Sequence, residues 1–249
     1  MSIEHTPLQG KRILVTGGTT GIGRAILALL AQKGGRVLTF GRNSEPLDDA
    51  LTHARQVGGD EVYGLTADVA YKEGVDEVFR AVDSQLGGID VLIANAGIGA
   101  KPAQETSDED WRYAVETDLM GYIACAREAI ARMGDKGGHI VFIGSLTSER
   151  KGKGSSVYAA AKAAGQVYAE ALRKEVQDKN IKVSIVEPGT VGADLRGPSE
   201  TPEMQREKIA KHEMLYAEEI ADAVAYVLEA SPRTDIVNLR IEPRLQPTG

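Results

Sequence analysis

The chain has one cysteine, Cys125, among its 249 residues, so no disulfide can form within it. A disulfide-stapled scaffold is therefore excluded, and a reducing compartment fits the composition. On a helix, a lone cysteine of this kind is expected to be a small, buried, apolar residue. Because histidines are also few and scattered, the sequence predicts no metal site. They are His5, His53, His139 and His212.

Basic residues are also fewer than acidic ones. The chain has 29 Lys and Arg residues and 36 Asp and Glu residues, which gives a formal net charge of −7. Nucleic-acid binding proteins need basic side chains to neutralise phosphates, so no nucleic-acid partner is expected. No window approaches the ~20 apolar residues of a membrane helix, and residues 1–7 lack the features of a signal peptide. We therefore expect a cytoplasmic protein with no membrane contact.

Short apolar runs alternate with amphipathic helical patterns along the chain. Six runs are almost continuously apolar, which is typical of parallel strands covered on both faces: 13–15, 37–40, 62–65, 91–94, 140–143 and 183–186. A seventh run, 236–241, alternates apolar and polar residues and predicts a half-exposed strand near a sheet edge. The repeated βα units predict an α/β fold, in which helices cover both faces of one doubly wound, parallel, seven-stranded sheet.

The longest insertion in this pattern spans about residues 193–217 and is rich in charge. Within it, Thr201-Pro202-Glu203 combines an N-cap residue, a proline at the first helical position and an acid in the first turn. A short helix is therefore predicted inside a loop. The segment is either a lid over a substrate site or a decorated connection. No linker and no second core interrupt the pattern, so residues 1–249 are expected to form a single domain.

A glycine-rich turn follows the first strand and opens the first helix. Glycines let a backbone approach a pyrophosphate closely, and the helix N-terminus offers it free N–H groups. The strand-turn-helix context predicts a Rossmann-type dinucleotide site. No Gly-Lys-Ser/Thr follows the turn, which excludes a P-loop, and no Gly-x-Ser-x-Gly elbow suggests a hydrolase. The residues of the predicted site are Gly17, Thr19, Gly21, Ile22 and Gly23.

The spacing Gly-x-x-x-Gly-x-Gly, with Thr16 in front, resembles the glycine motif of the short-chain dehydrogenase/reductase family. Three further segments resemble that family's cofactor contacts, and the resemblance runs from Lys11 to about Leu228. The matching residues are Asp68 and Val69 for the adenine, Asn95, Ala96 and Gly97 for the motif beside the cofactor, and Pro188, Gly189, Thr190 and Val191 for the nicotinamide carboxamide. The resemblance implies one dinucleotide-binding and catalytic domain.

The end of the second strand distinguishes the two nicotinamide dinucleotides. An NAD site needs an acid for the ribose 2′-OH, whereas an NADP site needs a cation for the 2′-phosphate. Gly41 stands where NAD-using relatives carry that acid, and Arg42 follows it with a forked, charged donor group. The pattern favours NADP(H) over NAD(H), although Arg42 could instead be an ordinary surface arginine. Thr20 replaces the family's other basic marker.

The predicted chemistry depends on Ser145, Tyr158 and Lys162. Tyr158 and Lys162 lie four residues apart and therefore on one face of a helix. A free tyrosine has a pKa of about 10, and a nearby ammonium favours the phenolate and lowers it. Ser145 follows the fifth strand, and its hydroxyl can form a hydrogen bond with the substrate oxygen that exchanges a proton with Tyr158. The set resembles the family's catalytic residues, which implies hydride transfer to or from a small carbonyl compound or secondary alcohol with Tyr158 as acid/base.

Asp118 departs from the family pattern, because an asparagine is expected at this catalytic position. A carboxylate loses the amide donors and adds a charge that must be paired or protonated. The runner-up interpretation is therefore an NADP(H)-binding sensor or scaffold with lost or weak turnover. By analogy with the family a homodimer or homotetramer is expected. Trp111 and Tyr113 lie where relatives pair their subunits, or else they simply pack in the core.

Overall fold

The computed structural model describes residues 4–149, 156–192 and 200–246. Its seven strands form one parallel sheet in the order β3-β2-β1-β4-β5-β6-β7. The strands are β1 (Arg12–Val15), β2 (Arg36–Gly41), β3 (Val62–Thr66), β4 (Val91–Ala94), β5 (Gly138–Ile143), β6 (Ile181–Pro188) and β7 (Asn238–Ile241). The predicted fold class is confirmed. The strand order reverses direction between β1 and β4, and ligands of such sheets bind at the carboxyl ends there.

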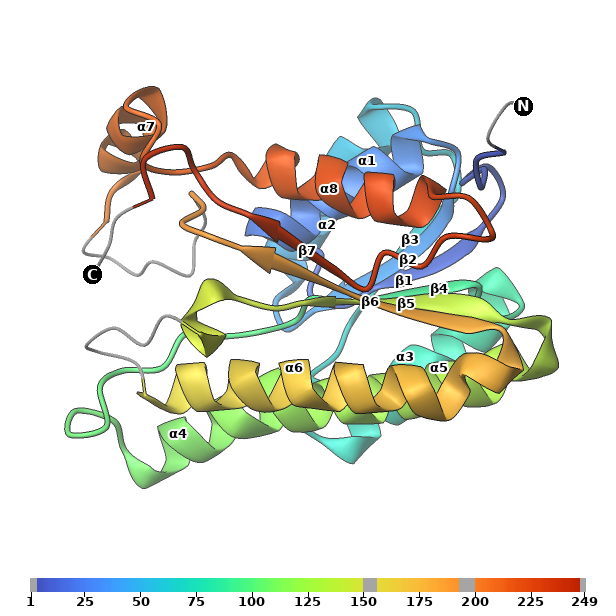
Figure 1. Ribbon diagram of the computed structural model, residues 1–249, viewed down its shortest axis with the longest axis horizontal. Coiled ribbons are helices and arrows are strands. Elements are labelled where there is room, and N and C mark those ends of the chain that lie inside the picture. Colours follow the sequence, from blue (N-terminus) through green and yellow to red (C-terminus); the bar gives the residue numbers. More distant parts are fainter. Residues whose placement is uncertain (1–3, 150–155, 193–199, 247–249) are drawn as a thin grey trace.

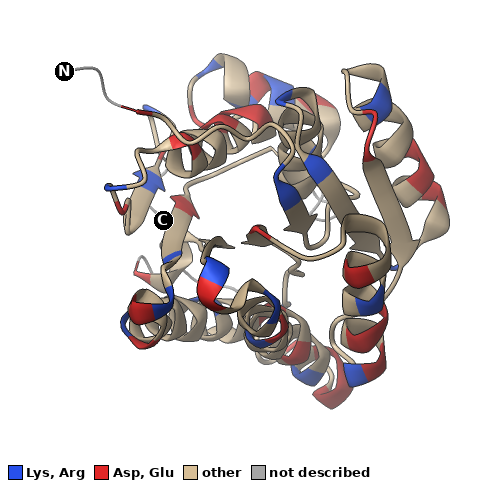
Figure 2. Cartoon of the chain, turned by 90° about the vertical axis from the view of Figure 1, so that its right-hand side faces the viewer, with Lys and Arg blue, Asp and Glu red and all other residues tan. Residues whose placement is uncertain are grey.

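Helices cover both faces of the sheet, with α1, α2 and α8 on one side and α3, α5 and α6 on the other (Figure 1). Their bounds are α1 (Gly21–Gln32), α2 (Ser44–Gln56), α3 (Lys72–Ala81), α4 (Asp108–Val115), α5 (Gly121–Met133), α6 (Ser156–Val176), α7 (Pro202–Ala210) and α8 (Ala217–Glu229). Charges of both signs are spread over the outer helices (Figure 2). Among the described residues, no helix is both long enough and apolar enough to span a membrane.

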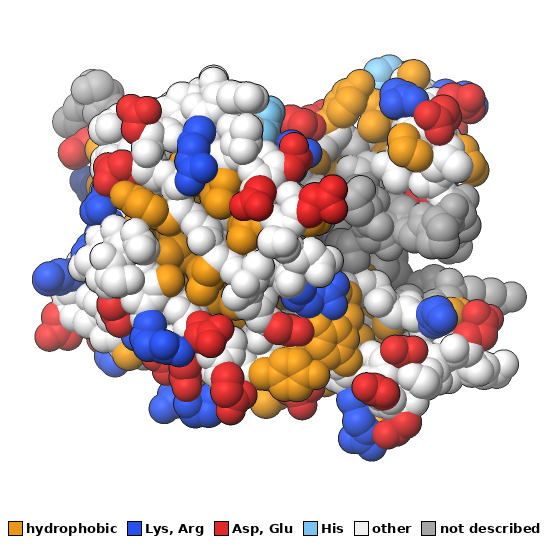
Figure 3. All heavy atoms as spheres, turned by 180° about the vertical axis from the view of Figure 1, so that it is seen from behind, with side chains coloured by type: hydrophobic (Ala, Val, Ile, Leu, Met, Phe, Trp, Pro, Cys, Tyr) orange, Lys and Arg blue, Asp and Glu red, His pale blue; other side chains and the backbone are white. Residues whose placement is uncertain are grey.

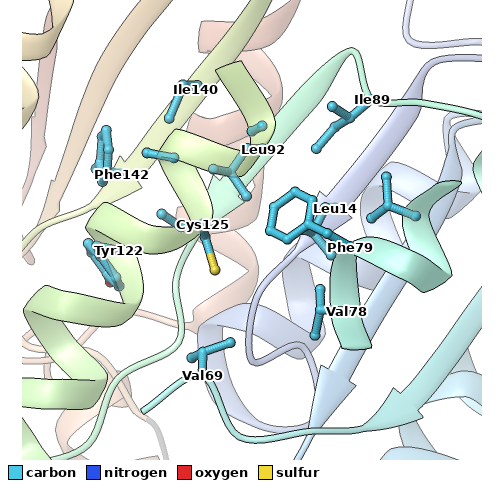
Figure 4. Close-up of a cluster of buried hydrophobic side chains, with 14 of the residues drawn as sticks. Leu14, Val69, Val78, Phe79, Ile89, Leu92, Tyr122, Cys125, Ile140 and Phe142 are labelled. Carbon is cyan, nitrogen blue, oxygen red and sulfur yellow. The ribbon is translucent and has the colours of Figure 1, made fainter. Parts of the chain in front are cut away.

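A hydrophobic core lies on each face of the sheet. The first packs strand residues such as Leu14 and Leu92 against Phe79 of α3 and Cys125 of α5 (Figure 4). Cys125 is 1% exposed, as the sequence predicts. Burial raises the pKa of its thiol to about 12, so the group stays protonated and unreactive at neutral pH. The second core joins β1 and β2 to α1, α2 and α8.

The two edge strands are half-exposed. In β7 exposed and half-buried residues alternate, as predicted, although the strand begins at Asn238 rather than at Ile236. The prediction of a strand buried on both faces was wrong for β3, whose burial also alternates beyond Val62. The reason is its place at the other edge of the sheet, where its neighbours cover it less completely.

The predicted short helix is α7, and the side chain of Thr201 caps it by accepting from the backbone N–H of Met204. Residues 193–199 of the predicted lid lie outside the described part of the chain. Helix α7 stands at the end of the molecule to which β6 and β7 point (Figure 1) and forms a lobe at the upper right of the view from behind (Figure 3). An open groove of about 660 Å³, lined in part by Gly21 and Gly192, separates it from α1 and α8.

Candidate functional site

The glycine turn after β1 is packed too tightly for side chains. Gly17 has a φ of 65°, and a Cβ there would lie 2.9 Å from the Cα of Ala96. A Cβ on Gly23 would collide with the carbonyl oxygen of Gly17. Glycine is therefore required at both positions, and the turn has the close backbone packing that a pyrophosphate loop needs.

Hydrogen bonds from neighbouring strands hold this turn in place. The Thr16 hydroxyl accepts from the backbone N–H groups of Asn95 and Ala96, both at 2.8 Å. The Asn95 amide donates to the carbonyl oxygens of Thr16 (3.0 Å) and Gly17 (3.1 Å). The structure therefore brings the predicted Asn95-Ala96-Gly97 motif against the glycine turn, across the ends of β4 and β1.

Helix α1 begins next to this turn without a side-chain cap. The Thr20 side chain makes no capping hydrogen bond, and no acid occupies the first turn. The N–H groups of that turn, which belongs wholly to the described residues, are therefore left for an anion, and the helix dipole favours negative charge there. Gly41 at the end of β2 is buried, and a Cβ on it would collide with the side chain of Thr19. These residues fit a dinucleotide, and a side chain at Gly41 would require the Thr19 side chain to move.

At the end of β2, the exposed Arg42 is connected to Asp68 through Tyr113 of α4. The Tyr113 hydroxyl donates to Asp68 Oδ2 at 2.6 Å and accepts from Arg42 Nη1 at 2.8 Å. The structure thus brings two predicted cofactor residues together, whereas Val69 is buried in the core beside them. Trp111 makes local contacts instead, since its indole N–H donates to Asp108 Oδ1 at 3.1 Å.

The segment after β6 is also anchored by hydrogen bonds. The N–H of Gly189 donates to the carbonyl of Ile241 at 2.7 Å, and that of Thr190 donates to Gln246 Oε1 at 3.0 Å. The Thr190 hydroxyl accepts from Gln246 Nε2 at 3.0 Å. Val191 forms an isolated parallel bridge with Leu215. The predicted carboxamide segment, which begins at Pro188, therefore lies at the carboxyl end of the sheet and is fixed by two later parts of the chain.

Ser145 follows β5 and begins a 3₁₀ turn, Leu146–Ser148. Its hydroxyl lies 2.7 Å from the Thr147 hydroxyl, and its carbonyl accepts from the Ser148 hydroxyl at 2.8 Å. Ser148 also lies 3.3 Å from Oε1 of Glu187, a carboxylate that is only 1% exposed. A Cβ on Gly144 would lie 3.2 Å from Glu187 Cγ, so this buried side chain supports the backbone on which Ser145 sits.

Lys162 of α6 is buried among aromatic rings and polar groups. Its ammonium donates to the Tyr122 hydroxyl at 2.9 Å and to the Ile143 carbonyl at 3.2 Å. It lies 5.7 Å from the centre of the Tyr158 ring, one turn earlier on the same helix. Burial by itself lowers the pKa of Lys162. The phenols of Tyr122 and Tyr158 and the carboxylate of Asp118 outweigh burial, so the pKa of Lys162 stands above its ordinary value.

Asp118 lies in a π-helical turn, Glu116–Met120, and is 1% exposed. Its Oδ1 accepts from the Ile98 N–H at 2.7 Å, but its Oδ2 is buried and has no hydrogen-bond partner in the described part of the chain. A Cβ on Gly97 would lie 3.4 Å from Lys162 Nζ and 3.5 Å from Asp118 Oδ1, so the two side chains converge there. Burial raises the pKa of Asp118 to about 6, against the opposing charge of Lys162.

We predict that Asp118→Asn stabilises the protein at alkaline pH. The native pKa of about 6 exceeds the ordinary value of 3.8, so native Asp118 resists ionisation. The contribution of Asp118 to the free energy of unfolding is therefore fully present below about pH 3.8 and is lost as the pH rises through 6. At pH 8 the variant should be about 1–3 kcal/mol more stable, since each pKa unit corresponds to about 1.4 kcal/mol. Urea unfolding at several pH values measures the difference, which should disappear near pH 4. A less stable variant at pH 8 would show that attraction to Lys162 outweighs burial.

Sequence reasoning did not assign to the site four residues that organise it. They are polar groups whose partners lie far along the chain: Thr39, Tyr113, Tyr122 and Glu187. Thr39, for example, is fully buried, accepts from the Gly18 N–H at 3.0 Å and donates to the Val15 carbonyl at 2.8 Å. A threonine or glutamate within an apolar strand is the one sequence signal that could have identified Thr39 and Glu187, because a buried polar group needs a partner.

Comparisons with known proteins agree with this architecture. The family model described as short chain dehydrogenase matches residues 11–204. An uncharacterized oxidoreductase of Staphylococcus aureus is 30% identical over 241 residues, which cover 96% of this chain and 99% of the relative. Carbonyl reductase family member 4 of Danio rerio is 34% identical over 183 residues, which cover 73% of this chain and 76% of the relative.

Solved structures share the fold over nearly the whole chain. A short chain dehydrogenase from Burkholderia cenocepacia, in complex with NADP, has a TM-score of 0.84 at 27% identity and covers 96% of this chain and 98% of its own. An alcohol dehydrogenase from the archaeon Thermococcus sibiricus, complexed with 5-hydroxy-NADP, has a TM-score of 0.84 at 26% identity and covers 95% of this chain and 98% of its own. The chain belongs to the short-chain dehydrogenase/reductase family of oxidoreductases, which use nicotinamide cofactors.

Proposed function

We propose that this protein transfers hydride between NADP(H) and a small carbonyl compound or secondary alcohol, with Tyr158 as the acid/base. The observation that carries the proposal is the buried Lys162 ammonium, which lies 5.7 Å from the Tyr158 ring and donates to Tyr122 at 2.9 Å. A buried cation beside a half-exposed phenol stabilises the negative charge that the phenol carries after it has given up its proton. Nothing in the packing of a purely structural helix requires that arrangement.

The roles of the chain's own residues follow from this geometry. Ser145 donates a hydrogen bond to the substrate oxygen and orients it. Tyr158 gives its proton to that oxygen during reduction and takes a proton from the alcohol during oxidation. Lys162 stabilises the phenolate left on Tyr158, because its charge persists throughout the physiological pH range. A nicotinamide cofactor, when bound at the carboxyl end of the sheet, would supply or accept the hydride.

The cofactor preference rests on Arg42 together with the buried Gly41, which stands where an NAD site would carry an acid. Two of the similar structures contain NADP or a derivative of it, which supports the same choice. Asn95, Gly97 and the uncapped start of α1 would hold the remainder of the dinucleotide.

We predict that Arg42→Met weakens NADPH binding about 10- to 100-fold but changes the Kd of NADH by less than about threefold. The variant keeps the side-chain stem and loses the charged hydrogen bonds, which are worth about 1.5–3 kcal/mol. Fluorescence titration with each dinucleotide gives both constants. Arg112→Met is the matched control, because Arg112 is also exposed but pairs with Asp108 on its own helix. Equal losses for NADPH and NADH would contradict the assignment of Arg42 to the 2′-phosphate.

A sensor or scaffold that binds NADP(H) with lost or weak turnover is the second candidate. The buried Oδ2 of Asp118, which has no hydrogen-bond partner among the residues that the structure describes, favours it, because a carboxylate there disturbs the charge around Lys162. The buried, hydrogen-bonded Lys162 and the supported Ser145 turn favour the enzyme instead.

One experiment separates the two candidates. Purified protein is mixed with NADPH and a panel of ketones, aldehydes and oxo acids, and NADPH oxidation is followed by absorbance, with NADH and Tyr158→Phe in parallel. Turnover that disappears in Tyr158→Phe supports the enzyme. Tight NADPH binding without reduction of any carbonyl favours the sensor, and Asp118→Asn is then tested for recovered turnover.

We also propose that residues 1–249 act as one dinucleotide-binding and catalytic domain with the substrate loop at about 193–217. The groove between α7 and the body supports this view, because Gly21 from the predicted cofactor turn and Gly192 both line it. The partners proposed are a small-molecule substrate and further copies of the chain, as a homodimer or homotetramer.

A further inference from the structure

Tyr113 joins two residues of the proposed cofactor site from a helix that the sequence does not assign to it. Its hydroxyl donates to Asp68 Oδ2 at 2.6 Å and accepts from Arg42 Nη1 at 2.8 Å. The Arg42 guanidinium carbon also lies 5.6 Å from the centre of the Tyr113 ring. One phenol therefore connects the end of β2, the end of β3 and helix α4.

The contact matters because Arg42 is otherwise an exposed, flexible side chain. A long side chain that binds a phosphate must give up most of its rotamer freedom, which weakens binding. A hydrogen bond and a ring contact that restrict the guanidinium beforehand remove part of that penalty. Tyr113 is half-buried, and its own ring packs against Tyr71 with the ring centres 6.4 Å apart, so it is a firm support.

Asp68 is fixed by the same phenol. Its Oδ1 accepts from the Ala70 N–H at 3.0 Å, and its Oδ2 accepts from Tyr113. Through this phenol the Asp68 carboxylate is linked to the Arg42 guanidinium, so a negative and a positive group are held on the same hydroxyl. Burial and the hydrogen bond to Asp68 raise the pKa of Tyr113, so the hydroxyl keeps its proton at neutral pH and serves as the donor to Asp68 and the acceptor from Arg42.

We infer that Tyr113 is a positioning residue for cofactor selection, which holds the Arg42 guanidinium ready for the 2′-phosphate of a phosphorylated dinucleotide. The inference rests on the proposed cofactor site. Because Asp68 serves the adenine that both dinucleotides share, whereas Arg42 serves the phosphate that only one carries, loss of the phenol hydroxyl affects the two ligands unequally.

Isothermal calorimetry of the full chain with NADP⁺ and with NAD⁺ tests this. We expect Tyr113→Phe to raise the Kd of NADP⁺ about 5- to 20-fold and that of NAD⁺ less than about threefold, as for the loss of one hydrogen bond to a charged group. Tyr71→Phe is the matched control, since the neighbouring tyrosine keeps its ring contact and its hydroxyl takes no part in the bridge. Neither constant should change in that variant. Thermal unfolding of each variant verifies that it is folded.

The outcomes separate this inference from the proposed function. Wild-type protein that binds neither dinucleotide would overturn both. A second outcome would overturn the role of Tyr113 alone. In it the wild-type protein prefers NADP⁺, and Tyr113→Phe either leaves the Kd values of NADP⁺ and NAD⁺ unchanged or raises both by the same factor. Tighter NADP⁺ binding by Tyr113→Phe would also overturn it, because the bridge would then hold Arg42 away from the phosphate.

Discussion

Tyr158→Phe should lower kcat for NADPH-dependent carbonyl reduction by about 10²–10⁴-fold, the usual contribution of a positioned acid or base. Phenylalanine keeps the ring that lies 5.7 Å from the Lys162 ammonium, so the packing of α6 is preserved. What disappears is the hydroxyl that gives its proton to the substrate oxygen. Binding of NADPH should change by less than about threefold, because the hydroxyl is needed mainly in the transition state.

Steady-state kinetics and a fluorescence titration with NADPH measure these two effects separately. Tyr168→Phe is the control on the same helix, because the half-buried Tyr168 packs edge-on against Phe142 at the margin of the core, with ring centres 5.9 Å apart. Its activity should equal that of the wild type. If Tyr158→Phe kept a tenth or more of the wild-type kcat, another group would have to supply the proton, and the proposed mechanism would be wrong.

The elements that the sequence could predict are those whose signal is local. The glycine spacing after β1 identifies a turn, because the glycines that let the backbone pack closely there are near one another in the sequence. The four-residue separation of Tyr158 and Lys162 suffices to put both on one face of α6. The seven strands were identifiable for a similar reason, since short apolar runs marked six of them and an alternation of apolar and polar residues marked the seventh.

The elements that the sequence could not predict depend on contacts between distant residues. Tyr122 lies 40 positions from Lys162, and only the packing of α5 against α6 brings its hydroxyl to the ammonium. Figure 4 shows the same tyrosine beside Phe142 in the core, a place where sequence patterns predict a purely apolar side chain. Tyr113 could not be assigned for the same reason. Its two hydrogen-bond partners, Arg42 and Asp68, follow β2 and β3 and lie far from it in the sequence.

Asp118 illustrates a third limit. Its departure from the family's asparagine is visible in the sequence, but its consequence depends on burial. The structure gives one carboxylate oxygen a backbone partner and leaves the other without one among the described residues, within a turn of π-helix. Such turns often occur at functional sites. The raised pKa of about 6 means that Asp118 changes charge within the range in which an enzyme works, which an asparagine cannot do.

Lys162→Met should lower kcat at pH 7 by about 10²–10³-fold while leaving a folded protein, since methionine retains much of the lysine stem. Removing the ammonium leaves the Tyr158 phenol without the positive charge that lies 5.7 Å from the centre of its ring. The negative charge that Tyr158 carries after proton transfer then lacks this stabilisation, so proton transfer to and from the substrate slows. Steady-state kinetics of carbonyl reduction and of alcohol oxidation at pH 7 measure the loss.

The same substitution tests the electrostatic link between Lys162 and Asp118. Without the ammonium, the buried carboxylate loses the charge that lowers its pKa, so the pKa of Asp118 should rise further above 6. Lys162→Met should therefore be destabilised at pH 8 more than at pH 5, and the double variant Lys162→Met/Asp118→Asn should recover stability but not turnover. Recovery of turnover in the double variant would mean that Lys162 serves only to neutralise Asp118, and the phenolate of Tyr158 would then need another source of stabilisation.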